Sequence, residues 1–395
     1  MKRSRIKRTI SVVTTARSDY GIYRPVLREI LKRRELCLRL IVAADHLSAR
    51  GGMTVREIEA DGFPVSDRIP MQPASDTAAG IAGAMARGLA GFAKAYQTHR
   101  PDILLVLGDR FEMHTAVAAA MPFGIPVAHL HGGELTEGAM DNQFRHSISK
   151  MSHIHFAATT GSGRRLLQMG EESWRVTVTG APSLDNLSEV SLMSRSRLES
   201  EAGMSLDPPP LLVTFHPVTL EPGKAECHTL ELLAALDLAG LPVLFTYPNI
   251  DMESCVIIRA VRHFVKSHPA CRLVKNLGTS RYFSMMKYAA AMVGNSSSGI
   301  IEAASFGLPV VNVGNRQLGR AHGRNVVDVP CDRTHIAKAI SKVTSPAFRQ
   351  KIKRLQNPYG NGHASVEIVR ILLTIPLGHS LIAKRFNDLG GVRRR

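Results

Sequence analysis

The sequence predicts a two-domain α/β protein in which each domain is a doubly wound, Rossmann-like parallel sheet. The chain has 395 residues, more than one hydrophobic core normally holds. Short apolar runs alternate with longer segments of helical period, and the alternation restarts after a polar, proline-rich stretch at 188–210. We therefore expect an N-terminal domain over residues 1–190 and a C-terminal domain over residues 191–395.

The first half of the chain has the spacing of consecutive strand–helix–strand units. Such units place parallel strands in one sheet with helices on both of its faces. Strands are expected at 9–15, 38–44, 103–107, 126–131, 153–157 and 176–179, and helices at 25–33, 77–98, 111–121, 143–150 and 163–169.

The second half repeats the same arrangement. Strands are expected at 211–215, 241–247, 272–274, 291–293, 309–313 and 326–329, and helices at 229–238, 254–267, 281–289, 298–306 and 333–343. The last forty residues have a helical pattern, and we expect them to pack back on the first domain. Sheets of this kind bind ligands at the carboxyl ends of their strands, so the active site is expected in the crevice between the domains.

Composition narrows the function classes. The formal net charge is +17, but ten of the fifty basic residues lie in the first eight and last twelve positions, where we expect solvated tails. Aromatic residues make up only 5% and do not interleave with the basic clusters, so no specific nucleic-acid surface is indicated. The residual charge suits an anionic substrate.

The sequence indicates a cytoplasmic protein. No apolar run approaches the roughly 20 residues that span a bilayer, and the basic N-terminus lacks the apolar stretch of an export signal. The five cysteines are scattered without a Cys-x-x-Cys pair, which favours reduced thiols over disulfides or a zinc site. As the default assembly we expect a homodimer.

Polar residues follow the ends of two expected strands, those at 9–15 and 103–107. Arg17 and Asp19 follow the first strand, where the arginine could meet a phosphate or the two could form a surface ion pair. Asp109 and Arg110 follow the strand at 103–107, where the aspartate could be a functional carboxylate or the N-cap of the next helix. No Gly-x-Gly-x-x-Gly follows any strand, which argues against a nicotinamide cofactor.

The next strand ends in a cluster of titratable residues. His131, Glu134 and Asp141 follow it, and adjacent strands would bring them towards Asp109. Clustered carboxylates raise one another's proton affinity, which suits proton transfer at carbon. A metal site is the competing interpretation, although the spacing matches no compact ligand motif.

The second half carries the strongest signal for a phosphate site. The strand at 291–293 runs into Gly294-Asn-Ser-Ser-Ser-Gly299 and a helix with Glu302. Hydroxyl groups and glycines at a helix N-terminus leave backbone N–H groups for an anion. Arg316 follows the next strand, and His216 and Asn249 follow the two strands before.

These segments resemble the hydrolysing UDP-N-acetylglucosamine 2-epimerases, the branch that feeds sialic acid and legionaminic acid synthesis. Seven motifs match in order between about residues 10 and 330, among them Gly108-Asp-Arg-Phe-Glu112, His131-Gly-Gly-Glu134, Gly294-Asn-Ser-Ser-Ser-Gly299 and Gly314-Asn-Arg-Gln-Leu-Gly-Arg320. The resemblance implies a glycosyltransferase-B-like fold in which the second domain holds most of the UDP. It also implies that neither a metal nor a nicotinamide is used.

The resemblance further implies a reaction and a set of site residues. UDP would leave carbon 1 while the proton leaves carbon 2, and water would then add with inversion at carbon 2. Some family members carry Glu at the position of His131, so either His131 or Glu134 is the working acid/base. The catalytic candidates are Asp109, Glu134, Asp141, His131 and His216, and the substrate-binding candidates are Arg17, Asp19, Arg110, Asn249, Ser296, Ser297, Glu302 and Arg316.

Several functions fit these residues. The first is hydrolysing 2-epimerisation of UDP-N-acetylglucosamine to N-acetylmannosamine and UDP. The same reaction on UDP-2,4-diacetamido-2,4,6-trideoxyglucose (UDP-diacetylbacillosamine) is the nearest alternative. A glycosyltransferase of the same fold, which would need an acceptor site, and a binder of nucleotide-sugars without activity are the others.

Overall fold

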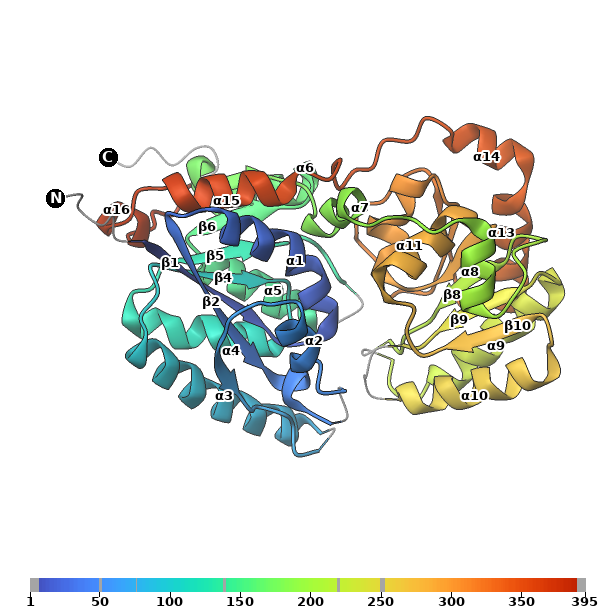
Figure 1. The fold of residues 1–395 in the computed structure, drawn as a ribbon, viewed down its shortest axis with the longest axis horizontal. Coiled ribbons are helices and arrows are strands. Elements are labelled where there is room, and N and C mark those ends of the chain that lie inside the picture. The colour runs from blue at the N-terminus through green and yellow to red at the C-terminus, as the bar shows by residue number, and fades with distance from the viewer. Residues whose placement is uncertain are drawn as a thin grey trace. The chain divides into compact units, whose positions relative to one another are not determined.

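A computed structural model describes residues 7–49, 52–75, 77–137, 140–218, 221–248 and 253–388 (Figure 1). The chain forms two compact units. Unit 1 comprises Met1–Glu134, Asp141–Asn186 and Gly362–Arg395, and unit 2 comprises Leu135–Met140 and Leu187–Asn361. Each unit is a parallel sheet covered by helices, and the two are described in turn.

Unit 1 contains a seven-stranded sheet in the order β3-β2-β1-β4-β5-β6-β7, and all neighbouring strands are parallel. The strands are β1 (Arg8–Thr14), β2 (Leu36–Ala43), β3 (Val65–Ile69), β4 (Ile103–Leu107), β5 (Val127–Leu130), β6 (Ile154–Ala157) and β7 (Val176–Val178). The helices of this unit are α1 (Arg17–Lys32), α2 (Val55–Ala60), α3 (Ala78–Thr98), α4 (Phe111–Ala120), α5 (Asp141–Met151), α6 (Thr160–Gln168), α15 (Ala364–Thr374) and α16 (His379–Ile382).

The sequence analysis missed β3 and misplaced the start of α1. The helix begins at Arg17, and Pro25, which was expected to open it, lies inside it. Proline has no N–H, so the carbonyl of Gly21, four residues earlier, lacks its helical donor. The side chain of Asn186 supplies that donor with an Nδ2···O distance of 3.0 Å. A tertiary hydrogen bond therefore lets the helix continue through its proline.

The C-terminal segment is part of the core of unit 1. Helix α15 packs against α1, and its residues Ile368, Val369 and Leu372 are fully buried in the core of this unit (Figure 1). The carboxylate of Asp185 accepts hydrogen bonds from the backbone of Ala364 and Ser365 and so satisfies the first N–H groups of α15.

Two cations of the expected solvated tails are instead part of the packing. Arg8 donates to the carbonyl of Leu372. Lys384 donates to the backbone of Ser152 and to the buried carboxylate of Glu171, which Lys150 and His155 also contact. Burial alone would raise the pKa of Glu171, but these partners outweigh it and lower the pKa to about 2. The prediction of a solvated tail was wrong at these positions because the buried carboxylate needs cationic partners.

Unit 2 contains a six-stranded parallel sheet in the order β10-β9-β8-β11-β12-β13. Its strands are β8 (Leu211–Thr214), β9 (Val243–Thr246), β10 (Cys271–Val274), β11 (Ala291–Gly294), β12 (Val310–Val313) and β13 (Val326–Val329). The helices are α8 (Arg195–Ala202), α9 (Ala225–Ala239), α10 (Ser254–Ser267), α11 (Gly278–Tyr288), α12 (Ser297–Ile301), α13 (Arg333–Thr344) and α14 (Pro346–Ile352), and the short α7 (Asn186–Glu189) lies where the two units join. The stretch at 188–210, expected as a linker, thus contains helix α8.

Both sheets have the doubly wound topology that the strand–helix alternation predicted. The strand order reverses beside β1 and β4 in unit 1 and beside β8 and β11 in unit 2. Ligands of doubly wound sheets bind beyond the carboxyl ends of the strands at such reversals. In the part of the chain that the structure describes, no helix has the length and apolar composition needed to cross a membrane.

Candidate active site

The loop after β5 holds a group of titratable side chains in unit 1. It begins at His131, whose φ of +62° is uncommon for a residue with a side chain. Gly133, with φ +74°, follows so tightly that a Cβ there would lie 2.4 Å from the carbonyl oxygen of Ser162. The His-Gly-Gly-Glu sequence therefore has a structural reason, because the second glycine lets the loop turn against α6.

Four side chains form one connected chain in this loop and its neighbours. His131 Nδ1 lies 2.6 Å from Glu134 Oε1, and Arg145 NH1 lies 3.7 Å from Glu134 Oε2. Arg145, on α5, also donates to the carboxylate of Asp109 and to the carbonyl of His131. His131, Glu134 and Arg145 are each at most 5% exposed, whereas the Asp109 side chain is 21% exposed. The structure thus brings three of the five catalytic candidates together around a buried arginine.

The second ring nitrogen of His131 is left for a ligand. Nε2 is buried and has no hydrogen-bond partner among the described residues. An imidazole that donates from Nδ1 to a carboxylate has its Nε2 available to a ligand. A buried polar atom without a partner is costly, and such an atom often marks a functional position. The arrangement of a carboxylate, an imidazole and an open ring nitrogen is one that can accept or deliver a proton.

A second histidine, on the strand that precedes this loop, fixes a neighbouring loop. His129 is fully buried on β5, and its Nε2 lies 2.8 Å from the carbonyl oxygen of Gly108. Burial lowers the pKa of His129 to about 3, so its ring is neutral and donates to that carbonyl. It links the loop that carries Asp109 to the strand that leads to His131.

Asp109 is not the helix cap that was the competing interpretation. The N-cap of α4 is Arg110, and the Asp109 carboxylate points instead to Arg145. Arg110 forms a bidentate pair with the buried Glu112 and lies 3.5 Å from Asp45. The guanidinium of Arg110 is therefore held in a fixed orientation next to Asp109.

Arg17 and Asp19 do not pair with each other as the competing interpretation had it. Arg17 lies 3.6 Å from Glu57 and its side chain is 43% exposed. Asp19 is buried and accepts hydrogen bonds from Thr14, Thr15 and the backbone of Ala16. Burial opposes its ionisation, but hydrogen bonds and the nearby His46 lower the pKa of Asp19 overall. Asp19 thus shapes the loop after β1, while Arg17 is accessible.

Asp141 is the first residue of α5, four positions before Arg145. Residues with this spacing share one face of a helix. A carboxylate in the first turn is also favoured by the helix dipole.

The centre of the candidate site in unit 2 is Asn295, which the sequence analysis quoted in a motif without giving it a role. Asn295 is fully buried after β11, and its side chain bonds both the N–H and the C=O of His216, at 2.7 and 2.8 Å. Its own carbonyl accepts from Arg316 NH1 and Gln317 Nε2, at 3.2 and 2.8 Å. One asparagine therefore joins the loops that follow β8, β11 and β12.

The serines form the N-terminus of α12. Ser296 is the N-cap, and its hydroxyl accepts from the N–H of Ser298. Gly294 precedes it with φ +134°, and a Cβ there would lie 2.1 Å from the carbonyl oxygen of Thr214. The glycine thus allows the loop to pass directly over β8 and to present Ser296 and Ser297 at this edge of the sheet.

Tyr282 on α11 is a member of this group that the sequence analysis missed. Its hydroxyl lies among the side chains of Ser298, Thr214 and Ser296, and Glu302 lies nearby. Burial, followed by the charge of Glu302, raises the pKa of Tyr282 to about 12 against the effect of the hydroxyl groups. No sequence signal distinguishes Tyr282 from other residues of its helix, because the strand order of the sheet brings it to the serines.

The remaining candidates of unit 2 surround the same loop. His216 is buried, and burial followed by the charge of Arg316 lowers its pKa well below the ordinary value. His216 is therefore neutral at pH 7. Glu302 is largely buried at the end of α12. Asn249 lies outside the described residues.

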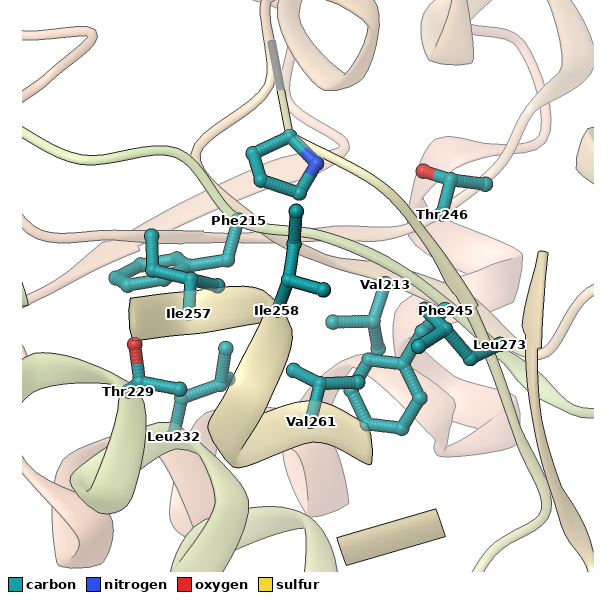
Figure 2. Close-up of a pocket in the computed structure, with 11 residues that line it drawn as sticks. Val213, Phe215, Thr229, Leu232, Phe245, Thr246, Ile257, Ile258, Val261 and Leu273 are labelled. Atoms are coloured by element: carbon teal, nitrogen blue, oxygen red, sulfur yellow. The ribbon is translucent and has the colours of Figure 1, made fainter. Parts of the chain in front are cut away.

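An apolar pocket lies elsewhere in unit 2, between α9, α10 and the sheet (Figure 2). Val213, Leu232, Phe245, Ile257 and Val261 line it, and Thr246 stands at its edge. Such a lining offers no charged group to a phosphate, so we do not assign the pocket to the anion site.

The fold and these two groups of residues define a class of protein. Two doubly wound parallel sheets, one with a buried group of ionisable side chains and the other with a polar loop around Asn295 at its strand ends, are the architecture of glycosyltransferase-B-like proteins. No group of three or more His, Cys, Asp or Glu side chains suited to a metal ion occurs within the described ranges.

Comparison with known proteins gives the family. The model of the UDP-N-acetylglucosamine 2-epimerase family matches residues 28–373. The UDP-N,N'-diacetylbacillosamine 2-epimerase (hydrolyzing) of Legionella pneumophila is 37% identical over 380 residues, which are 96% of this chain and 99% of that protein. The GDP/UDP-N,N'-diacetylbacillosamine 2-epimerase (hydrolyzing) of Campylobacter jejuni is 36% identical over 97% of this chain and 100% of that protein. The chain belongs to the UDP-N-acetylglucosamine 2-epimerase family.

Solved structures agree with the fold. The UDP-GlcNAc 2-epimerase of Neisseria meningitidis, solved with UDP-GlcNAc, superimposes with a TM-score of 0.80 at 19% identity, covering 92% of this chain and 99% of that one. The resemblance to the hydrolysing 2-epimerases and the predicted glycosyltransferase-B-like fold are thereby confirmed.

Proposed function

We propose that the protein catalyses hydrolysing 2-epimerisation of a UDP-2-acetamido sugar. The observation that carries the proposal is the His131–Glu134–Arg145–Asp109 group, in which a buried imidazole has one ring nitrogen fixed by a carboxylate and the other left for substrate. The anion site of unit 2 supplies the second requirement, donors for a departing diphosphate.

In the first half of the reaction, the bond between carbon 2 and its hydrogen and the bond between carbon 1 and UDP break. UDP leaves with the bonding electrons, and a double bond forms between carbons 1 and 2. His131 Nε2 accepts the proton, and Glu134 stabilises the imidazolium that forms. Arg145, whose NH1 lies 3.7 Å from Glu134 Oε2, places a positive charge beside that carboxylate.

In the second half, a protonated carrier gives its proton to carbon 2 on the face opposite to the one that lost its hydrogen. Water adds its hydroxide to carbon 1, and the remaining proton of that water returns to the carrier. Inversion therefore needs a second proton carrier, because one group cannot reach both faces of the sugar. Asp109 is that carrier in our proposal, since it is the more exposed carboxylate of the group and is hydrogen-bonded on one side only by Arg145. Asp141, on the same face of α5 as Arg145, is a further candidate.

In unit 2 we propose that Ser296, Ser297 and Arg316 hold the diphosphate, with Glu302 on the ribose. Backbone N–H groups and hydroxyl groups at the start of a helix such as α12 suit an anion. Arg316 brings the positive charge. His216 is neutral and can donate or accept a hydrogen bond there. Asn249, Arg17 and Arg110 complete the proposed binding set, with Asp19 positioning the loop of Arg17.

As the sugar we propose UDP-N,N'-diacetylbacillosamine. The proteins named for this substrate are 37% and 36% identical to the chain, whereas a Neisseria meningitidis serogroup B protein named UDP-N-acetylglucosamine 2-epimerase is 29% identical. UDP-N-acetylglucosamine is the second candidate substrate, because the family is named after its epimerisation.

The test is to incubate the purified protein with each sugar nucleotide without an acceptor and to follow free UDP and free sugar by NMR. We expect UDP and a manno-configured 2-acetamido sugar from UDP-diacetylbacillosamine, at a rate at least tenfold above that from UDP-N-acetylglucosamine. Higher turnover of the latter would reverse the substrate choice. Binding without turnover of either would favour a binder, and turnover only with an added acceptor would favour a transferase.

We also propose that the enzyme is a homodimer that works in the cytoplasm. Twofold dimers are the commonest soluble assemblies, and all five cysteines are free thiols, as in a reducing compartment. Light scattering should give about twice the chain mass of 43.1 kDa, and the mass of a single chain would contradict the dimer.

A further inference from the structure

The segment between the two ends of the acid/base group belongs to unit 2. The chain leaves unit 1 after Glu134, contributes Leu135–Met140 to unit 2, and returns to unit 1 at Asp141, where α5 begins. Helix α5 carries Arg145, the partner of Asp109 and Glu134. Both ends of this short segment are therefore attached to residues of the proposed acid/base group.

The segment rests on the loop that follows β12. The N–H of Glu137 donates to the carbonyl of Leu318 at 3.2 Å. Gly319 has φ +83°, and a Cβ there would lie 2.9 Å from Leu135 Cβ and 3.1 Å from Glu137 Cδ. The contact is thus close enough that even one added methyl group must displace the segment.

The same loop is joined to the anion site. Gln317 and Arg316 both donate to the carbonyl of Asn295, whose side chain holds the backbone of His216. A continuous series of contacts therefore runs from the proposed diphosphate residues through Gly319 to the residue next to Glu134. Coupling through packed contacts requires such a physical connection.

We propose that Leu135–Glu137 transmits nucleotide occupancy of unit 2 to the acid/base group, with Gly319 as the contact that positions it. When diphosphate orders the loop around Arg316, Gly319 fixes Leu135 and Glu137, and these hold Glu134 against His131. Gly319 is thus a positioning residue that does not touch the reacting atoms. The inference rests on the proposed function, because it takes UDP as the ligand of unit 2 and His131 as the proton carrier.

The experiment compares Gly319→Ala with Gly240→Ala. Gly240 caps α9 with φ +63°, and a Cβ there would meet nothing within 4 Å, so this variant carries similar backbone strain without the contact. Turnover, UDP affinity by calorimetry and the ring signals of ¹⁵N-labelled histidine are measured with and without UDP. His131→Asn assigns the signal of His131.

For Gly319→Ala we expect kcat to fall at least tenfold and the UDP-induced shift of the His131 signal to be lost, while the Kd for UDP changes less than threefold. Gly240→Ala should change none of these. Glu137→Ala, which removes the side chain over Gly319, should lower kcat in the same direction and serves as the test if Gly319→Ala does not fold. Unchanged kcat and an unchanged shift, or equal losses of kcat and UDP affinity, would overturn the inference. A wild-type protein that neither binds UDP nor turns over would instead refute the proposed function.

Discussion

The two candidate sites are built from different chemical groups, although both lie at strand ends of the same kind of sheet. The site in unit 1 is a chain of ionisable side chains, His131, Glu134, Arg145 and Asp109. The site in unit 2 is organised by an amide, Asn295, together with serine and tyrosine hydroxyl groups. A group that moves protons must change its charge, whereas a site for a diphosphate needs fixed donors, neutral or cationic, that keep their charge.

The largest effects should follow from removing a proton carrier in unit 1. For His131→Asn and for Glu134→Gln we expect kcat to fall by about 10²–10⁴, because general acid–base catalysis contributes about that factor. UDP affinity should change less than threefold, since we propose that unit 2 holds most of the nucleotide. Steady-state kinetics and calorimetry measure these two values. A variant that lost as much UDP affinity as kcat would contradict the proposal that unit 1 carries the acid/base residues while unit 2 binds UDP.

The converse change is Asn295→Ala in unit 2. It leaves the backbone N–H and C=O of His216 without their side-chain partner, so we expect a loss of about 2 kcal/mol in the free energy of unfolding and at least a tenfold loss of UDP affinity. Asn325→Ala is the matched control, because Asn325 is equally buried and bonds the carbonyl of Leu308. The control should lose stability but keep its affinity for UDP, as measured by urea unfolding and calorimetry.

The comparison also shows what the sequence could predict. The parallel strands and most helices follow from periodicity, and the residues at strand ends follow from the rule for doubly wound sheets. Arg145 and Tyr282 could not be assigned in that way, because they lie on helices and reach the sites only through the strand order. Pro25 and Lys384 were misjudged because tertiary partners, Asn186 and Glu171, override local preference.

Acid should weaken unit 1 through its buried histidines. Burial lowers the pKa of His129 to about 3 and that of His153 to about 4, below their ordinary value near 6.5. The unfolded chain therefore takes up these protons first, so the stability that the neutral rings confer is complete above about pH 6.5 and is lost as pH falls towards those values. Between pH 7 and pH 5 we expect a loss of roughly 1–2 kcal/mol per histidine.

Urea unfolding of the wild type and of His153→Asn at several pH values checks this prediction. The variant should show a shallower decline with acid, because one of the two titrating groups is gone. An unfolding free energy that rose as the pH fell from 7 to 5 would have the wrong sign for buried neutral histidines.

The smallest expected effect is that of the Tyr282 hydroxyl. Tyr282→Phe removes the hydroxyl group that lies among Ser296, Ser298 and Thr214 but keeps the ring, so the serines lose a polar neighbour. We expect UDP affinity to fall about threefold, in line with roughly 0.5–1.5 kcal/mol for one hydrogen bond. Tyr288→Phe on the same helix, whose hydroxyl bonds the carbonyl of Met193, should leave the affinity unchanged when both are titrated with UDP.

The central claim is that unit 1 exchanges the proton at carbon 2 of the sugar. The most direct measurement is a single turnover of UDP-N,N'-diacetylbacillosamine in deuterated water, with the product sugar analysed by proton NMR. We predict one deuterium at carbon 2 of every molecule of free sugar, released together with UDP, and no such product from His131→Asn. Free sugar that kept its original hydrogen at carbon 2 would show hydrolysis without proton exchange and would contradict the account.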